Sequence, residues 1–599
     1  MLLLLASLLQ CNATPPYQGP ADQPPPLPAG PSVAPTQPSP ERPSVPAPST
    51  PGPNAPGPST PGPAVTPGPV TGGGLGGPRT GGIDLGPQLD WRDWWWLNGY
   101  EYFRPGPRPT LATGDGGGAQ GTRSGDDPEV AAARETVRRA LRDRDDRVRA
   151  SAAITAGRIL DPSLRPALLE LLADGSLLVR QCAIAGLGLA GTEESAHVLL
   201  RIGISSTLDS ARAPSLEERD LALLSLGIGA HRGARARYAP ALRTFLSRAT
   251  SNERRALGPS SALSLALAGD DTALLEDLVA VAKDRQAPPP LRARALWGFR
   301  QGSASADALR PVALGCLEED RDVDVRRAAA LALGRLAAGA EDEVLAALRS
   351  SIDSEGDTAV RAFSLLAMGE VGGPAAKKEL LERVTRGKQL IRPWAAIGAG
   401  LLGRKDRDAE LGRSLAKALS EEKNKDTRAA LVLGIGLAKV SDAREMVRHI
   451  VVNGEHGRER VFAAVAVALG EDEEGRPTLR RAMKDIPSPS SRATMALALS
   501  TFSNVEDLPS LLESFQSADE PGVIGTSALA LAWHGTAPAL ETLRRDVETS
   551  KRAERRAVAL LALGIGVAPE RVPVSIAATG GWNYLASLEA AHTAARLWM

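Results

Sequence analysis

The chain has 599 residues, and its 70 Lys and Arg residues balance 70 Asp and Glu residues, so the formal net charge at pH 7 is zero. Apolar residues make up 43% of the sequence, aromatic residues only 4%, and there are three cysteines. This composition is typical of a soluble helical protein rich in Ala, Leu and Val. It disfavours a polytopic membrane protein, a disulfide-stabilised domain and a nucleic-acid binder that depends on overall basicity.

The N-terminal residues resemble an export signal. Met1–Leu9 is nearly all apolar but too short to span a bilayer as a helix, and no positive residues precede it. The run Leu-Leu-Gln-Cys that ends at Cys11 resembles a bacterial lipoprotein box, although Gln10 departs from the small residue of that pattern. Cleavage after Ala13 is the alternative. We predict that residues 1–13 form a signal or lipoprotein segment and that the protein is extracytoplasmic (cell envelope or secreted). In the lipoprotein alternative, Cys11 is the lipid anchor and the N terminus holds the protein at a membrane.

Two linkers are predicted before the main body of the chain. Residues 14–82 are rich in Pro and Gly, and residues 11–70 alone hold 22 of the 47 prolines. Such a stretch lacks the apolar side chains that would offset the entropy of ordering, so it is expected to be a disordered, semi-extended stalk. A second, Gly-rich linker is predicted at residues 105–125.

A Trp-rich segment at residues 83–104 separates the two linkers. Seven of the 21 aromatic residues of the chain fall within residues 91–103. Disordered linkers do not carry such clusters, because exposed Trp is adhesive. Two interpretations stay open: a peptide that docks onto a partner or a membrane interface, or a segment that folds back over the apolar end of the downstream domain. The candidate partner-binding residues are Trp91, Trp94, Trp95, Trp96 and Tyr100.

From residue 126 onward the sequence is a helical repeat. Its motif, of the form Val-Arg-x-x-Ala-Ala, has an anchor at the Val position, and copies are spaced by about 34 residues. The anchors lie near residues 148, 179, 218, 260, 291, 325, 360, 391, 427, 461, 491, 523 and 555. Asp145, Asp322 and Asp357 lie three residues before an anchor, where a side chain can cap a helix. Gly lies nine residues after the anchor in ten of the thirteen copies, where it permits close packing or a left-handed helix end.

Arg directly follows the anchor in ten of the thirteen copies. The first turn of a helix is the unfavourable end of the helix dipole for a positive charge. We therefore expect these side chains to bond outward, to backbone carbonyls or to an Asp of the adjacent repeat, and so to fix the register between repeats. The residues of this ladder are Arg149, Arg180, Arg219, Arg292, Arg326, Arg361, Arg392, Arg428, Arg492 and Arg556.

A second helix follows in each copy, and stacking of such pairs buries faces that one pair leaves exposed. The period, the Val-Arg-x-x-Ala-Ala motif and the Gly resemble the HEAT-repeat family, in particular short bacterial repeats related to those of bilin lyases. The resemblance covers residues 126–570 and implies an all-α fold: a right-handed α-solenoid of about 13 two-helix repeats, preceded by the disordered stalk. The Trp-rich segment is similar to one in large secreted HEAT-repeat proteins of planctomycete-type bacteria. Residues 571–599 break the pattern and are expected to cap the last apolar face.

No motif indicates catalysis, and we predict no catalytic, cofactor-binding or metal-binding residue and no cofactor. Two Gly-x-Gly-x-x-Gly runs, at Gly186 and Gly398, fall at one repeat position near a helix end, whereas a dinucleotide site needs a strand before the turn. His449 and His456 are the best metal candidates, but Asn453-Gly454 between them is expected to break the helix. HEAT-like di-iron deoxyhypusine hydroxylases carry repeated His-Glu pairs, and this sequence has none.

These observations favour a non-catalytic scaffold for protein–protein interactions. We expect it to be a monomer that binds protein partners and no nucleic acid. The alternative is a HEAT-like lyase or hydroxylase-type oxidoreductase, or an accessory factor of one. That alternative requires clustered metal ligands or a deep polar pocket.

Overall fold

The computed structural model describes one compact unit within residues 91–568, with nine described ranges. These are residues 91–98, 102–103, 127–205, 212–229, 235–267, 272–299, 306–354, 356–406 and 408–568. The predicted segments 1–13, 14–82, 105–125 and 571–599 lie outside the described residues. The described residues form helices and connecting turns with no strand, which confirms the all-α fold class. Within the same residues, no helix combines the length and the apolarity needed to cross a membrane.

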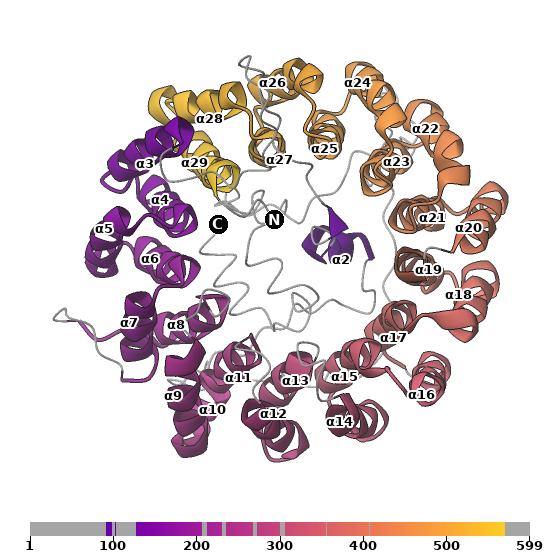
Figure 1. Cartoon of the computed structure of the whole chain (residues 1–599), viewed down its shortest axis with the longest axis horizontal. Helices are drawn as coiled ribbons and strands as arrows, with labels where there is room; N and C mark the ends of the chain where they lie inside the picture. The colour runs from indigo at the N-terminus through magenta and orange to yellow at the C-terminus, as the bar shows by residue number, and fades with distance from the viewer. Residues whose placement is uncertain are drawn as a thin grey trace, which may run out of the picture. The chain divides into compact units, whose positions relative to one another are not determined.

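The helices α3 to α29 alternate between an inner and an outer layer (Figure 1). In the described part of the chain, the inner layer has thirteen helices: α4 (Asp146–Ile159), α6 (Leu177–Ala190), α8 (Leu216–Gly229), α11 (Gly258–Leu267), α13 (Pro289–Gly298), α15 (Val323–Leu336), α17 (Thr358–Val371), α19 (Arg392–Asp406), α21 (Lys425–Leu437), α23 (Gly457–Leu469), α25 (Pro489–Ser500), α27 (Pro521–His534) and α29 (Ala553–Val567). This agrees with the predicted array of about 13 two-helix repeats.

The outer layer consists of α3 (Pro128–Ala140), α5 (Arg165–Glu170), α7 (Glu193–Gly203), α9 (Arg235–Arg248), α12 (Thr272–Lys283), α14 (Ala306–Glu319), α16 (Glu341–Ser354), α18 (Gly373–Arg386), α20 (Ala409–Glu421), α22 (Arg444–Asn453), α24 (Arg476–Asp485), α26 (Leu508–Gln516) and α28 (Ala537–Thr549). A short extra helix, α10 (Ser251–Ala256), joins α9 to α11. Single 3-10 turns flank several outer helices: η2 (Pro162–Leu164), η3 (Leu171–Ala173), η7 (Ser441–Ala443), η8 (Glu473–Gly475) and η9 (Val505–Asp507). The helix α2 (Trp91–Asn98) precedes the array.

The array closes on itself. Each inner helix packs against the next inner helix, and the last one, α29, packs against the first one, α4, so that α3 to α29 form a ring (Figure 1). The sequence led us to expect an exposed final face covered by residues 571–599. That face of α29 packs against α4 instead, so the first and last repeats cap each other.

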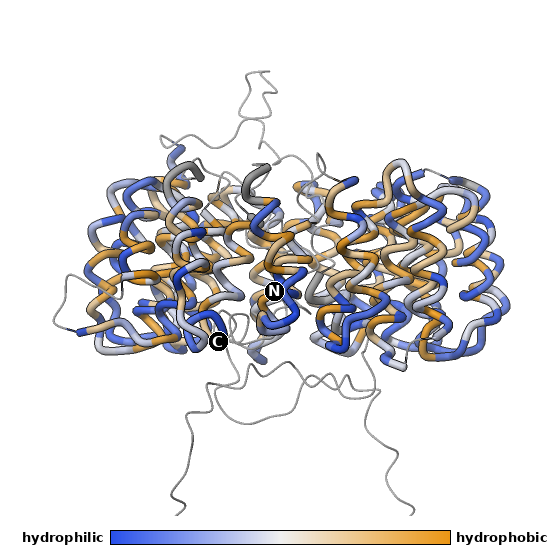
Figure 2. Tube along the Cα trace, turned by 90° about the horizontal axis from the view of Figure 1, so that it is seen from below, coloured by the Kyte–Doolittle hydropathy of each residue, from blue (hydrophilic) through white to orange (hydrophobic). Residues whose placement is uncertain are grey.

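Hydrophobic patterning decides which helix of a pair faces inward. In α21, every residue from Ala429 to Leu437 is buried, so this inner helix is apolar on all sides. In α18, the buried residues are Ala376, Leu380 and Val384, spaced by four, which form a single stripe toward the inner layer. Hydrophobic residues accordingly gather in the middle of the helices, and hydrophilic residues gather toward their ends and outer sides (Figure 2).

The three predicted Asp caps each start an inner helix. The Asp145 carboxylate accepts the backbone N–H of Arg147 at 3.0 Å, and Asp357 accepts that of Val360 at 2.9 Å. Asp322 caps α15 in the same way. The predicted helix break between the two histidines is also confirmed, because α22 ends at Asn453 and α23 begins at Gly457.

Candidate functional site

The ladder arginines lie between an outer helix and the next inner helix. Arg392 donates from Nε to the carbonyl of Val384 at 2.7 Å, and Arg428 donates from Nη1 to that of Leu419 at 3.0 Å. Both carbonyls belong to the last turn of the preceding outer helix. Each guanidinium therefore lies at the favourable, negative end of a neighbouring helix dipole, although it stands in the first turn of its own helix.

Most of these arginines also reach a carboxylate of the following repeat. Arg149 makes two bonds to Asp174, Nε–Oδ2 at 2.9 Å and Nη2–Oδ1 at 3.0 Å. Burial by itself would raise the pKa of Asp174, but hydrogen bonds from Arg149 and from the Ser176 amide lower it overall. The same bridge joins Arg180 to Glu218, Arg292 to Asp320, Arg392 to Glu422 and Arg428 to Glu459.

The remaining ladder positions differ in their partners. Arg219 donates to the carbonyl of Gly203 and lies 3.6 Å from Glu253 of the next repeat. Arg326 and Arg492 donate to carbonyls that precede their own helices. Arg361 has a buried Nε with no hydrogen-bond partner among the described residues.

The sequence alignment misplaced one copy of the repeat. Its anchor was set at Val461, but α23 begins at Gly457, which puts the structural anchor at Glu459, three residues after the capping position. Arg460 then follows the anchor, and its Nε donates to the carbonyl of Val451 at 2.9 Å. The spacing of nine residues matches that of Arg428 and its carbonyl, so Arg460 is a ladder residue that the apolar alignment missed.

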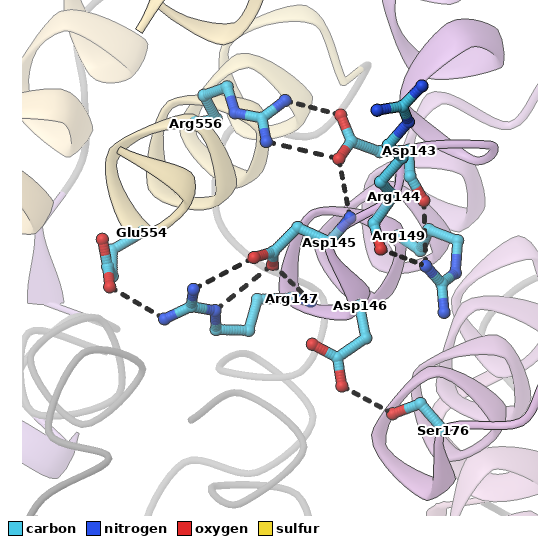
Figure 3. Close-up of polar contacts among 9 residues, drawn as sticks. All are labelled: Asp143, Arg144, Asp145, Asp146, Arg147, Arg149, Ser176, Glu554 and Arg556. Atoms are coloured by element: carbon cyan, nitrogen blue, oxygen red, sulfur yellow. Dashed lines mark hydrogen bonds and ion pairs between the residues drawn. The ribbon is translucent and has the colours of Figure 1, made fainter. Parts of the chain in front are cut away.

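The last rung of the ladder closes the ring (Figure 3). Arg556 on α29 bonds to both carboxylate oxygens of Asp143, at 2.5 and 3.3 Å, across 413 positions of sequence. Asp143 lies two residues before the cap Asp145 and accepts its backbone N–H at 2.9 Å. Asp174, the acceptor of Arg149, likewise lies two residues before the capping position of its helix, Ser176, and accepts the Ser176 amide at 2.8 Å. The closing joint thus has the same chemistry as an interior joint.

Further bonds cross the closing joint. Arg147 donates to Glu554 at 2.8 Å, and the Thr155 hydroxyl donates to the carbonyl of Leu560 at 3.1 Å in the buried interior of the joint. In the outer layer, α3 and α28 meet through the bond from Arg139 to Glu548 at 2.7 Å. The joint is therefore bonded from the inner to the outer layer.

The recurring glycine is the point of closest approach between inner helices. A Cβ atom built on Gly369 would stand 2.2 Å from the carbonyl oxygen of Gly398, so only Gly fits there. On α29, a Cβ built on Gly564 would stand 2.8 Å from Cγ2 of Thr155. Gly398 and Thr155 each lie seven residues after their own anchor, so the closing joint also keeps the register of the interior joints.

The aromatic segment lies inside the ring, on the side of helices α19 to α23 (Figure 1). Trp91, Trp94 and Trp95 are buried, with Trp95 fully enclosed. This placement corresponds to the fold-back interpretation, except that the segment covers the inner wall and not an end of the array. Trp96 has no described side chain, and Tyr100 lies outside the described residues.

Three aromatic side chains of the segment each pack against an aromatic side chain of the wall. The ring centroids of Trp94 and Trp394 on α19 are 5.7 Å apart, edge to face. Those of Trp91 and Phe462 on α23 are 4.8 Å apart. Phe103 was not among the candidate partner-binding residues predicted from the sequence. Its ring centroid lies 5.6 Å from that of Trp533 on α27. Aromatic pairs at these separations contribute about 0.5–1.5 kcal/mol each beyond the burial of area.

Polar contacts fix the orientation of the segment. Arg92 lies 3.5 Å from Asp426 on α21, and that carboxylate also receives a bond from Arg458 at 2.7 Å. The guanidinium of Arg404 lies over the ring of Tyr102, 5.6 Å from its centre. The segment is therefore held by both aromatic and charged contacts.

The described residues contain no group of three or more His, Cys, Asp or Glu side chains placed to hold a metal ion. Cys182 is buried, and burial raises the pKa of its thiol well above the usual range. Burial likewise raises the pKa of Cys316 to about 11. Cys182 is thus a buried residue of α6, and Cys316 is a partly buried residue of α14.

A family model for HEAT repeats matches residues 134–218 and 310–400. No curated protein matches the chain in sequence. Among solved structures, the karyopherin Kap121p bound to the SUMO protease Ulp1p is similar at a TM-score of 0.35 and 13% identity, over 69% of this chain and 54% of that one. The chain thus spans about half the length of that karyopherin.

Two other solved structures are similar to parts of the chain. Kap95p in complex with RanGDP has a TM-score of 0.34 and 12% identity, over 75% of this chain and 67% of that one. Human deoxyhypusine hydroxylase has a TM-score of 0.20 and 18% identity, over 48% of this chain and 99% of that one. Both segments that match the HEAT-repeat model lie within the stacked helical pairs of the ring. The chain therefore contains HEAT repeats at residues 134–218 and 310–400.

Proposed function

We propose that this ring is a non-catalytic scaffold for protein–protein interactions. The observation that carries the proposal is the inner wall, which already holds a short peptide segment through side-chain contacts. The repeat arginines bond within and between repeats, so their charge is committed to holding the wall together. Stacked helical pairs of this kind present continuous surfaces that suit the binding of proteins.

Chemical cross-linking of the full chain in its native extract tests this proposal. We expect the same protein to be recovered in repeated trials, with cross-links that map to the ring and with recovery in the reciprocal direction. As a matched control, the ring unfolded by denaturant before cross-linking should lose those cross-links. Recovery that is equal with folded and unfolded chain would contradict a scaffold function.

We also propose that the protein is exported and bound to the envelope through Cys11. The apolar run Met1–Leu9 and the lipoprotein-like Leu-Leu-Gln-Cys sequence support this part of the proposal. Fractionation of the tagged full chain beside a Cys11→Ala variant tests it. We expect the unaltered chain in the membrane fraction and the variant released from it; equal fractionation of the two chains would contradict lipid anchoring.

A further inference from the structure

The inner wall carries an aromatic strip, which we define as Trp394 on α19, Phe462 on α23 and Trp533 on α27. These side chains are between 1% and 2% exposed, although they belong to the layer that faces the inside of the ring. Each one lies within 4.8 to 5.7 Å, between ring centroids, of an aromatic side chain of the segment 91–103. The segment is therefore a cover for a surface that is aromatic across three alternate inner helices.

The side chains of the segment match the strip in both aromatic and charged contacts. Trp91 and Trp94, one helical turn apart, reach α23 and α19, while Arg92 between them lies 3.5 Å from Asp426 on the intervening α21. Trp95 points to the segment's own Tyr102 ring, stacked at 5.9 Å. The wall therefore recognises two aromatic residues at positions i and i+3 of a helix, with a basic residue between them.

Several features make this occupant separable from the ring. Neighbouring helices from α3 to α29 contact one another directly, including at the closing joint, and α2 is not one of the stacked pairs. The helix α2 has eight residues, too few to be stable by itself in water. Its tether to α3 includes residues 104–127, in which seven of 24 residues are glycine. The buried indole N–H of Trp95 has no hydrogen-bond partner among the described residues, so docking leaves one polar group unsatisfied.

We propose that the aromatic strip is a peptide-binding surface, that residues 91–103 are its intramolecular occupant, and that the partner is a protein carrying a short helix with the same pattern. That pattern is a pair of aromatic residues at i and i+3 with a basic residue between them. The inference rests on the proposed scaffold function and names the part of the ring that serves it. The segment then acts as a tethered competitor that a partner helix must displace.

The tether sets the strength of this competition. Short Gly-rich linkers in general give a tethered ligand an effective concentration on the order of millimolar. A free peptide of equal affinity, supplied at micromolar concentration, therefore binds the unaltered chain poorly. Binding becomes visible when the contacts of the tethered segment are weakened but the strip is left intact.

The test uses the full chain and a fluorescein-labelled peptide with the sequence of residues 88–104, followed by fluorescence anisotropy. We expect the double variant Trp91→Ala/Trp94→Ala to bind the peptide at least tenfold more tightly than the unaltered chain. Adding Trp394→Ala to that variant should reverse the gain. As a matched control, Leu390→Ala, at a side chain that is 54% exposed next to α19, should leave it unchanged.

Equal, weak binding by the unaltered chain and the double variant would overturn the proposal, because the segment would then be a fixed brace of the ring. A gain that survives Trp394→Ala would also overturn it. Hydrogen exchange of the unaltered chain covers the case in which the double variant fails to fold. We expect the amides of α2 to exchange at least tenfold faster than those of α19 and α23; equal protection would overturn the proposal.

Three further outcomes distinguish this proposal from the scaffold function and from self-association. A native partner whose cross-linking is unaffected by Trp394→Ala would leave the scaffold standing and overturn the role of the strip. A chain that dimerises in light scattering, and becomes monomeric with Trp94→Ala, would show that the segment serves a second copy and would overturn a separate partner. Peptide binding with no partner captured by the full chain would count against the scaffold alone.

Discussion

The bond between Arg556 and Asp143 makes the closed ring testable by one substitution. Arg556→Gln removes the charge and the forked geometry but keeps a long polar side chain. The two side chains are 22% and 19% exposed, close to the 19% and 12% of the interior pair Arg149 and Asp174. A hydrogen bond to a charged group contributes about 1.5–3 kcal/mol, and partial exposure to water reduces this to about 1–2 kcal/mol.

Native-state hydrogen exchange measures this loss where it occurs. A decrease of about 1–2 kcal/mol in the free energy of opening corresponds to exchange that is about 5- to 30-fold faster. We expect Arg556→Gln to accelerate exchange in α29 and α4, the two helices of the closing joint. The matched variant Arg149→Gln should accelerate α4 and α6 by a similar factor and leave α29 unchanged.

The result that would refute the closed ring is an asymmetry between the two variants. If Arg149→Gln acts as expected but Arg556→Gln leaves exchange in both α4 and α29 unchanged, then the closing bond does not form in solution. Small-angle X-ray scattering gives an independent measurement, because opening the ring exposes two ends and increases the radius of gyration. The unaltered chain should show no such increase as salt is raised, since the joint also contains the buried bond from Thr155 to Leu560.

The other predictions concern single positions. Gly369→Ala should lower the free energy of unfolding by about 1–3 kcal/mol in denaturant titrations, because the added Cβ would stand 2.2 Å from a backbone oxygen. The control Gly315→Ala, where nothing lies within 4 Å of the added Cβ, should be neutral or stabilising. Equal effects of the two variants would contradict the close approach of the inner helices. The pKa of Asp174 is lowered in the folded chain, so its contribution to the free energy of unfolding is complete above about pH 4 and is lost as the pH falls through the folded pKa. Asp174→Asn should therefore reduce the loss of thermal stability below about pH 4. An unchanged loss of stability in acid would count against the Arg149–Asp174 bridge. Iodoacetamide at pH 8 should leave Cys182 unmodified in the native chain and label Cys316 slowly, with both labelled after denaturation; rapid native labelling of Cys182 would show that its helix is not buried.

The sequence by itself determined the repeating unit. The apolar period, the capping Asp residues and the recurring Gly define where each helix pair begins and how closely pairs approach, and all three depend on local spacing. The same spacing failed at Val461, where apolar residues matched in the wrong register. The helix start at Gly457 corrects it, because a cap and not an apolar residue fixes the first turn.

Closure of the array was decided by tertiary structure. Whether thirteen repeats form a ring depends on a small rotation at every joint, and the sum of those rotations cannot be obtained from any one copy. A signal was present nonetheless: Asp143 precedes the first inner helix of the described array, and Arg556 directly follows the anchor of the last one. These two side chains bond to each other.

The aromatic segment divides in the same way between sequence and structure. Its composition determined that it would be buried, because a cluster of Trp residues is costly to expose to water. Where it docks was decided by the ring, since Trp394, Phe462 and Trp533 lie 139 positions apart at most in sequence and form one strip only after α19, α23 and α27 have stacked. Burial is a property of composition, whereas a binding surface made from separate repeats exists only in the folded chain.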